Sequence, residues 1–170
     1  MKKTTLCFLV KAKAGGLPEE VMLARKKKGL GEGNWNGVGG KVEPGETCEE
    51  AAARETWEET GAIIEEKDLE KAAVISFKHP KERNGWDQEC HIYLTRRWKG
   101  TPAESQEMME PRWFPVSALP FKDMWPDDPH WLPLVLAGKK LRAAFHFSKD
   151  GKGFDSFQID EVKDLSTENK

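Results

Sequence analysis

The sequence is poor in cysteine and has no excess of charge of either sign, and both shortages exclude classes of protein. Its three cysteines, Cys7, Cys48 and Cys90, include no Cys-x-x-Cys pair, which argues against a zinc finger or a disulfide scaffold and favours a reducing compartment. The 27 lysines and arginines nearly balance the 29 aspartates and glutamates, for a net charge of −2. Because this balance supplies no global field for a polyanion, we expect no nucleic acid polymer as partner.

Long hydrophobic runs are also missing. The apolar stretch 6–10 is too short for a signal peptide or a membrane span, and Lys11 and Lys13 follow it closely. We therefore expect a cytoplasmic protein with no membrane partner, and we expect a monomer. A chain of 170 residues can bury a core without a disulfide or a structural metal. Its length predicts a single domain over residues 1–160 and a charged tail, 161–170, that frays.

Short strand-like runs recur along the chain. Residues 4–11 and 20–25 flank a turn rich in glycine and proline, which predicts a β-hairpin. Further strands are expected over residues 72–78, 89–97, 111–115, 141–147 and 154–159. Strands mixed with two unequal helices indicate an α/β or α+β sandwich whose sheet is covered on both faces.

Two segments carry helical signals. Residues 48–60 begin with a capping-box pattern, contain three consecutive alanines and are followed by Gly61 at the position of a C-terminal cap. The second helix is expected within 125–139, where Asp128 supplies an N-cap and Pro129 is a proline of the first turn.

An acidic cluster lies on the first helix, behind a glycine-rich loop. Residues 28–45 contain seven glycines, so we expect another part of the molecule to dock closely against this backbone. Glu55, Glu58 and Glu59 are spaced i, i+3 and i+4, so their carboxylates converge on one stripe of the helix. Such a cluster suits a hard cation such as Mg²⁺ or Mn²⁺. Taken alone, the three glutamates are better explained as a solvated acidic face of the helix.

The glutamates belong to a longer motif, Gly-x5-Glu-x7-Arg-Glu-x2-Glu-Glu-x-Gly. Its fixed positions are Gly40, Glu46, Arg54, Glu55, Glu58, Glu59 and Gly61. This spacing resembles the signature of the Nudix hydrolases. The resemblance implies a Nudix α/β/α sandwich with a mixed central sheet, and hydrolysis of a nucleoside diphosphate linked to another moiety. Thr56 and Ala62 stand where the family usually has bulky aliphatic residues, which concerns packing of the helix on the sheet.

The resemblance also implies roles for the motif residues. Glu55, Glu58 and Glu59 would hold Mg²⁺, for which Mn²⁺ can substitute, and Glu59 is the candidate general base. Arg54 belongs to the catalytic set, most simply by pairing with Glu46 and so tying the loop to the helix. A polyphosphate is itself negative, so a site built mainly from carboxylates binds it only through bridging cations. The metal is therefore required for this interpretation.

Three longer segments, 26–42, 100–105 and 120–128, resemble the animal MutT-homologue branch of this family, whose enzymes hydrolyse oxidised purine nucleoside triphosphates. The branch pattern adds Gly39 and Glu107 to the metal-binding residues. It implies a set of substrate-binding residues: Thr5, Lys26, Asn36, Val38, Gly39, Gly40, Lys41, Phe77, Trp125, Pro126, Asp127, Asp128 and Trp131.

The chemistry of these residue types agrees with a purine pocket. An aromatic wall stacks on a purine, and an amide or carboxyl group reads its polar edge. By this resemblance Asn36 contacts the purine and Lys26 faces the phosphates. Phe77 and Trp131 are as readily explained as core residues, and Asp128 as a helix cap.

We therefore expect hydrolysis of oxidised purine nucleoside triphosphates, of the 8-oxo-dGTP and 2-oxo-dATP type, to the monophosphate and pyrophosphate, which sanitises the nucleotide pool. Leu30 and His79 replace aromatic residues that the branch usually carries, so the preferred base stays open, as does selectivity for ribose or deoxyribose. One alternative is a Nudix enzyme for a dinucleotide or cap-like substrate. Another is a non-catalytic nucleotide-binding module, although such modules commonly lose the metal carboxylates that this chain keeps.

Overall fold

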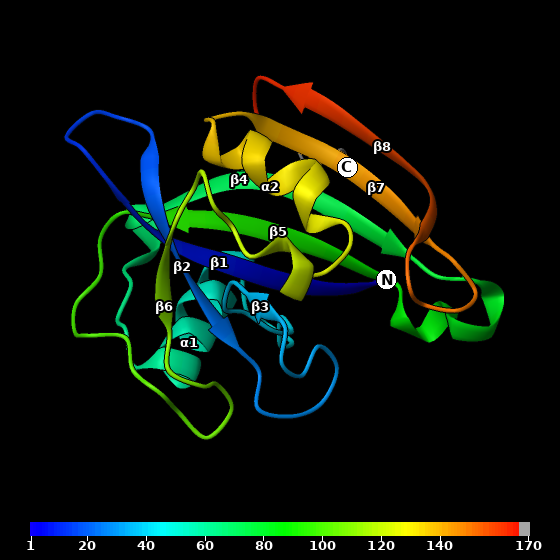
Figure 1. Ribbon diagram of the computed structural model, residues 1–170, viewed down its shortest axis with the longest axis horizontal. Helices are drawn as coiled ribbons and strands as arrows, with labels where there is room; N and C mark the ends of the chain where they lie inside the picture. Colours follow the sequence, from blue (N-terminus) through cyan, green and yellow to red (C-terminus); the bar gives the residue numbers. More distant parts are fainter. Residues whose placement is uncertain (167–170) are drawn as a thin grey trace.

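The computed structural model describes residues 1–166, and a mixed eight-stranded β-sheet runs through it (Figure 1). The strands are β1 (Lys2–Ala12), β2 (Pro18–Arg25), β3 (Trp35–Asn36), β4 (Leu69–Lys78), β5 (Gln88–Thr95), β6 (Arg112–Pro115), β7 (Lys140–Phe147) and β8 (Phe154–Val162). The helices are α1 (Cys48–Thr60) and α2 (Asp128–Leu136), with short 3-10 turns η1 (Glu66–Asp68), η2 (Lys81–Trp86) and η3 (Phe121–Asp123). None of the helices within residues 1–166 is long and apolar enough to cross a membrane.

The strand order is β3-β2-β1-β5-β4-β7-β8, and β6 pairs with β2 beside this path. The pairs β1–β5 and β4–β7 are parallel, and the other pairs are antiparallel. The predicted hairpin is confirmed, since β1 and β2 pair in antiparallel register with Val10 opposite Val21. Parallel neighbours among antiparallel ones make the sheet mixed, as the sequence implied.

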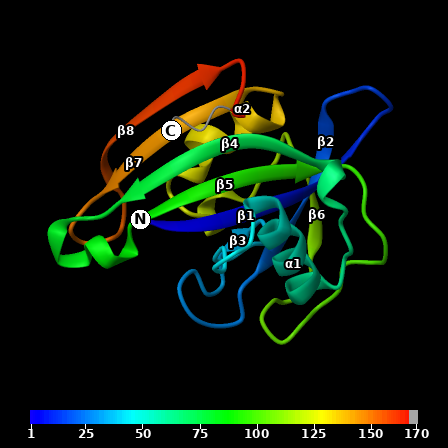
Figure 2. The same ribbon diagram turned by 180° about the vertical axis from the view of Figure 1, so that it is seen from behind.

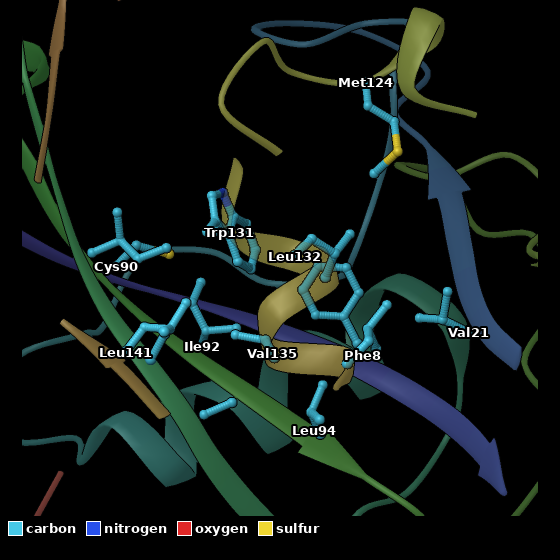
Figure 3. Close-up of a cluster of buried hydrophobic side chains, with 14 of the residues drawn as sticks. Phe8, Val21, Cys90, Ile92, Leu94, Met124, Trp131, Leu132, Val135 and Leu141 are labelled. Carbon is cyan, nitrogen blue, oxygen red and sulfur yellow. The ribbon is translucent and has the colours of Figure 1, made fainter. Parts of the chain in front are cut away.

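The two α-helices cover opposite faces of the sheet, as Figures 1 and 2 show from the two sides. Alternate residues of β1 serve the two layers. Phe8 and Val10 join the core beneath α2, whereas Cys7 and Leu9 join the core beneath α1. In Figure 3 Trp131 of α2 lies among the side chains of the first of these cores. The expected sandwich is confirmed.

Helix α1 begins and ends as predicted. The Thr47 hydroxyl accepts a hydrogen bond from the Glu50 N–H at 3.1 Å, and the Glu50 carboxylate accepts one from the Thr47 N–H at 2.8 Å. Gly61 closes the helix with a φ of 79°, a conformation that suits glycine. Thr56 and Ala62 are fully buried against the sheet. The Thr56 hydroxyl donates a hydrogen bond to the Ala52 carbonyl at 2.7 Å, so it has a partner although it is buried.

Helix α2 differs from its prediction at the first residue. Asp128 is the first helical residue rather than the N-cap, and the N-cap position belongs to Asp127, whose side chain makes no capping hydrogen bond. The Asp128 carboxylate instead accepts a hydrogen bond from the Trp125 N–H at 3.2 Å. The pattern of two aspartates before a proline therefore predicted the first residue of α2 to within one position.

The chain beyond residue 160 is more ordered than predicted. Strand β8 continues to Val162, and Leu165 is buried. Glu161 and Val162 are held in place because β8 pairs with β7, where Leu141 lies opposite Glu161 and Lys140 lies opposite Val162. The expected fraying was therefore wrong for this part of the tail. The same expectation for residues 167–170 lies outside the described residues.

Candidate active site

The glycine-rich loop lies directly on strand β1, as its composition predicted. The Thr5 N–H donates to the Gly40 carbonyl at 2.8 Å, and Cys7 and Val38 exchange two backbone hydrogen bonds of 2.6 and 3.0 Å. A Cβ atom at Gly39 would collide with the Thr5 carbonyl. Gly39 therefore permits an approach between loop and strand that any larger residue would prevent.

This loop holds the carboxylate of Glu59. The side chain is 4% exposed and accepts a hydrogen bond from the Gly39 N–H at 3.0 Å. Burial is the main cause that raises the pKa of Glu59 to about 8, and the negative charges of Glu55 and Glu107 raise it further. The hydrogen bond from the Gly39 N–H and the positive charge of Lys26 act in the opposite direction. Without a cation this carboxyl group therefore keeps a proton near neutral pH.

Arg54 links the loop to the other two glutamates. Its guanidinium donates to both oxygens of Glu46, at 2.7 and 3.0 Å, and to the Lys41 carbonyl at 3.0 Å. The predicted pairing with Glu46 is thus present. The same group also donates to Glu55 at 3.0 Å and to Glu58 at 3.3 Å. Burial raises the pKa of Glu55, while the Arg54 hydrogen bond and charge oppose that rise.

The carboxylates are not gathered around a point. Within residues 1–166, no group of three or more His, Cys, Asp or Glu side chains is arranged to hold a metal ion. Arg54 instead neutralises Glu55 and Glu58, and Glu59 turns toward Gly39. A Cβ atom at Gly40 would collide with the Glu55 carboxylate, so the loop presses on this group as well.

The donor set nevertheless fits a hard divalent cation. Carboxylate oxygens are the ligands that Mg²⁺ prefers, and a backbone carbonyl can complete the set. Glu107 lies close enough to Glu55 and Glu59 for its charge to raise the pKa of both. Its backbone carbonyl accepts a hydrogen bond from the Lys27 N–H at 2.9 Å. Glu55 and Glu59, whose pKa values neighbouring acidic charges help to raise, are stabilised in their ionised form by a bound cation.

A second acidic site lies at the start of α2, where Asp127 and Asp128 are both buried. Asp127 accepts a hydrogen bond from the Trp131 indole N–H at 2.9 Å, and Asp128 accepts one from the Trp125 backbone. Burial raises the pKa of both carboxyl groups. The Trp131 hydrogen bond opposes the rise for Asp127, whereas the charge of Asp127 adds to it for Asp128. The pair therefore ionises less readily than exposed aspartates.

Trp131 packs in the core beneath α2. It is 1% exposed and packs edge-on against Phe8, with ring centroids 6.1 Å apart (Figure 3). Its polar contact is the hydrogen bond that holds Asp127. Through this hydrogen bond Trp131 contacts the buried aspartate pair.

The other expected pocket residues are half-buried and come from separate elements. Phe77 on β4 stacks on Phe145 with centroids 5.9 Å apart. Trp125 lies against the glycine-rich loop, because a Cβ at Gly31 would stand 3.1 Å from its ring. Asn36 on β3 accepts a hydrogen bond from the next backbone N–H at 2.8 Å.

Some expected substrate contacts lie apart from the aspartate pair. The alternation along β1 directs the Thr5 side chain to the α1 face, whereas Asp127 and Asp128 lie beside the α2 face. Pro126 is exposed, and the Val38 side chain is buried in the core under α1. The structure therefore has two separate sites. One contains the glutamates of α1 and the glycine-rich loop, and the other contains Asp127, Asp128 and the tryptophans that donate hydrogen bonds to them.

Sequence reasoning did not assign Cys90 or Met108 to either site. Cys90 on β5 is buried close enough to Asp127 and Asp128 for their charges to raise the pKa of its thiol, after the larger effect of burial. Met108, which follows Glu107 in the sequence, is buried and forms an isolated antiparallel β-bridge with Lys26. Strand alternation around Cys90 indicated an inward side chain, but no local signal indicated its neighbours.

Comparison with known proteins places the chain in a family. Residues 2–135 match the family model of the NUDIX domain. The chain is 43% identical over 145 residues to the oxidized purine nucleoside triphosphate hydrolase of Mus musculus, which covers 85% of this chain and 89% of the relative. It is 42% identical over 151 residues to the enzyme of the same name from Danio rerio, which covers 87% and 91%.

A solved structure supports the fold independently. The mutator MutT protein from Bacillus halodurans matches with a TM-score of 0.74, covering 94% of this chain and 98% of that one, at 21% sequence identity. Identity this low carries information about the fold alone. Together with the family model and the two relatives, the architecture establishes that the chain belongs to the Nudix family of hydrolases.

Proposed function

We propose that the protein hydrolyses oxidised purine nucleoside triphosphates, of the 8-oxo-dGTP and 2-oxo-dATP type, to the monophosphate and pyrophosphate. The names of the mouse and zebrafish relatives, at 43% and 42% identity, support this substrate class. The structural observation that carries the proposal is the buried pair of Asp127 and Asp128 beside the half-buried Trp125. Such a pair can read the polar edge of a base that the tryptophan stacks on.

The reaction would need Mg²⁺, with Mn²⁺ able to substitute. Glu55, Glu58, Glu59, Glu107 and the carbonyl of Gly39 are the residues that would hold it. When bound, the cation neutralises phosphate charge and lowers the pKa of a coordinated water.

Glu59 is proposed as the general base. The Gly39 N–H fixes one carboxylate oxygen and leaves the other for an attacking water. Arg54 has a supporting role, because its bonds to Glu46 and Glu55 hold the loop against α1.

The remaining proposed residues bind the substrate. Lys26 and the backbone of residues 38–41 would meet the phosphates, and Asn36, Phe77 and Trp125 would contact the base. A protonated aspartate donates a hydrogen bond and an ionised one accepts, so Asp127 and Asp128 can satisfy bases with different edges.

Pyrophosphate release from a panel of triphosphates with Mg²⁺ tests the function. The panel contains normal, 8-oxo, 2-oxo and methylated purine triphosphates, each as ribose and deoxyribose forms, together with dinucleotide and cap-like compounds. We expect the highest kcat/KM for an oxidised purine triphosphate. Faster turnover of a dinucleotide or cap-like compound would favour another Nudix activity, and no turnover of any compound would favour a binding module.

We further propose that the enzyme acts as a cytoplasmic monomer with one Nudix domain, and that it has no nucleic acid polymer as partner. Among the described residues 1–166, Cys7, Cys48 and Cys90 form no disulfide bond, which suits a reducing compartment. Light scattering of the purified protein measures the oligomeric state, and a mass near the monomer value of 19.3 kDa is expected.

A further inference from the structure

Two buried polar atoms on the α1 face of the sheet have no hydrogen-bond partner among residues 1–166. They are Oγ1 of Thr5 and Nδ1 of His91. Both side chains are almost fully buried, at 3% and 2% exposed. A buried donor or acceptor without a partner is costly, so two of them at one place call for an explanation.

The two residues lie side by side on neighbouring strands. Thr5 of β1 and His91 of β5 are register partners in the parallel pair. Cys7 on β1 and Tyr93 on β5, each two residues further along, pack into the core beneath α1. Because strand residues alternate between faces, Thr5 and His91 also point to that face.

Their hydrogen-bonding chemistry is complementary. His91 Nε2 lies 2.9 Å from Oε1 of Glu89, and a carboxylate accepts, so Nε2 carries the hydrogen and Nδ1 is left as an acceptor. Burial lowers the pKa of His91, the Glu89 hydrogen bond opposes this, and Lys71 and Lys3 add to the lowering, which favours the neutral ring. The Thr5 hydroxyl can donate. One water molecule between the two atoms is the smallest group that satisfies both.

This pair lies beneath the loop that holds the candidate base. The Thr5 N–H donates to the Gly40 carbonyl at 2.8 Å, and the Thr5 carbonyl is in contact with Gly39. The Gly39 N–H in turn donates to Glu59 at 3.0 Å. A shift of the strand at Thr5 therefore moves the hydrogen bond that orients Glu59.

We propose that one buried water molecule joins His91 to the Thr5 hydroxyl, and that His91 is a positioning residue whose hydrogen-bonded chain from Glu89 to Thr5 fixes the strand beneath Gly39. This series of hydrogen bonds orients Glu59 without touching the substrate. The role of His91 rests on the proposed function only in that Glu59 acts as the base.

A crystal structure of the full chain, at a resolution near 1.5 Å, tests the water directly. We expect one ordered water within about 2.7–3.2 Å of both Thr5 Oγ1 and His91 Nδ1. Nitrogen NMR of the imidazole should show a neutral ring with the hydrogen on Nε2. A dry gap between the two side chains, or a hydrogen on Nδ1, would overturn the proposal. Both measurements use the unaltered protein and need no substrate.

A double-mutant cycle tests the positioning role. His91→Leu and Thr5→Val each break the chain, so each should lower kcat about tenfold, the scale of a small misplacement of a catalytic group, with KM little changed. Because both remove the same connection, the double variant should also lose about tenfold, whereas independent losses would multiply to about a hundredfold. A multiplied loss would contradict the shared water.

Tyr93→Phe is the matched control. It removes another buried polar contact from the same face of β5, the 2.8 Å hydrogen bond from the Tyr93 hydroxyl to Glu49, but that bond reaches the start of α1 rather than the loop. Its kcat should stay within about twofold of wild type. An equal fall of kcat in the control would make the effect one of general packing. The cycle uses whichever nucleotide the wild type turns over, so failure on oxidised purines would count against the proposed function and leave this test intact.

Discussion

The backbone N–H of Gly39 donates a hydrogen bond to the carboxylate of Glu59 at 3.0 Å. This contact joins the loop on β1 to helix α1 across 20 positions of the sequence. It holds a buried acid, whose pKa is raised to about 8, next to Glu55 and the charge of Glu107. The candidate site is therefore a strained balance of like charges that a divalent cation would relieve, and its residues can be tested one at a time.

The first prediction concerns the carboxylates. Glu58→Gln and Glu59→Gln should each lower kcat by at least about 10²-fold, because each removes a proposed metal ligand, and Glu59 also the base. Steady-state pyrophosphate release at saturating Mg²⁺ measures this. Glu66→Gln is the control, since Glu66 is an exposed acid in η1 outside the cluster. Near-normal turnover in both site variants would remove the assignment.

The second prediction concerns removal of the metal. With a chelator present and the pH above about 8, where Glu59 is ionised, the repulsion among Glu55, Glu59 and Glu107 is unrelieved in the wild type, and neutral glutamine at position 59 lessens it. The Tm of Glu59→Gln should therefore match or exceed that of the metal-free wild type. Added Mg²⁺ should raise the Tm of the wild type more than that of the variant, since ligand binding stabilises the folded state. A large fall in Tm without metal would instead assign Glu59 a structural role.

Local signals explain what the sequence could predict of this fold. Helix α1 was predictable because its capping box and Gly61 act within a few residues. The contact of Gly39 with Glu59 was not, because it depends on where β1 places the loop. The glycine content showed that something docks there, but not which atom.

Long-range packing explains the differences. Trp131 was left open between core and pocket because both interpretations need an apolar face on α2, and only the position of Phe8 on another element decides. Leu165 was expected in a frayed tail because the residues around it are mostly charged, yet it is buried. The start of α2 was missed by one residue because Asp127 and Asp128 both precede Pro129 and fit a cap equally well.

The third prediction concerns base recognition. Asn36→Ala and Trp125→Ala should lower kcat/KM for the purine triphosphate and leave the Mg²⁺ concentration for half-maximal activity unchanged, because neither residue is among the proposed metal ligands. A thermal scan beside the kinetics separates the alternatives. If either residue acts only in packing, its variant will melt early and its kcat/KM at low temperature will be normal.

The fourth prediction concerns pH and the stability of the fold. Burial, with the added charge of Asp127, raises the pKa of Asp128 well above its usual range. The protonated carboxyl group therefore contributes stability that is complete below its unfolded pKa of about 3.9 and is lost as the pH rises through the higher folded value. The Tm of the wild type should fall relative to Asp128→Asn as the pH is raised from 4 toward neutral. Parallel curves for the two proteins would show an ordinary pKa.

The last prediction joins the buried aspartates to substrate choice. Asp127 and Asp128 are both buried with raised pKa values, and the charge of Asp127 acts on Asp128, so one proton held by either of them lets the pair present a donor and an acceptor in either order. Asparagine fixes the donor and acceptor at one of the two positions. Asp127→Asn and Asp128→Asn should therefore each discriminate between 8-oxo-dGTP and 2-oxo-dATP more sharply than the wild type, measured as the ratio of the two kcat/KM values. Because Asp127 also holds Trp131, its variant should be checked for a normal Tm before the ratio is interpreted. An equal loss for both substrates in each variant would leave the aspartates with packing and helix-start roles and exclude proton exchange as the source of dual recognition.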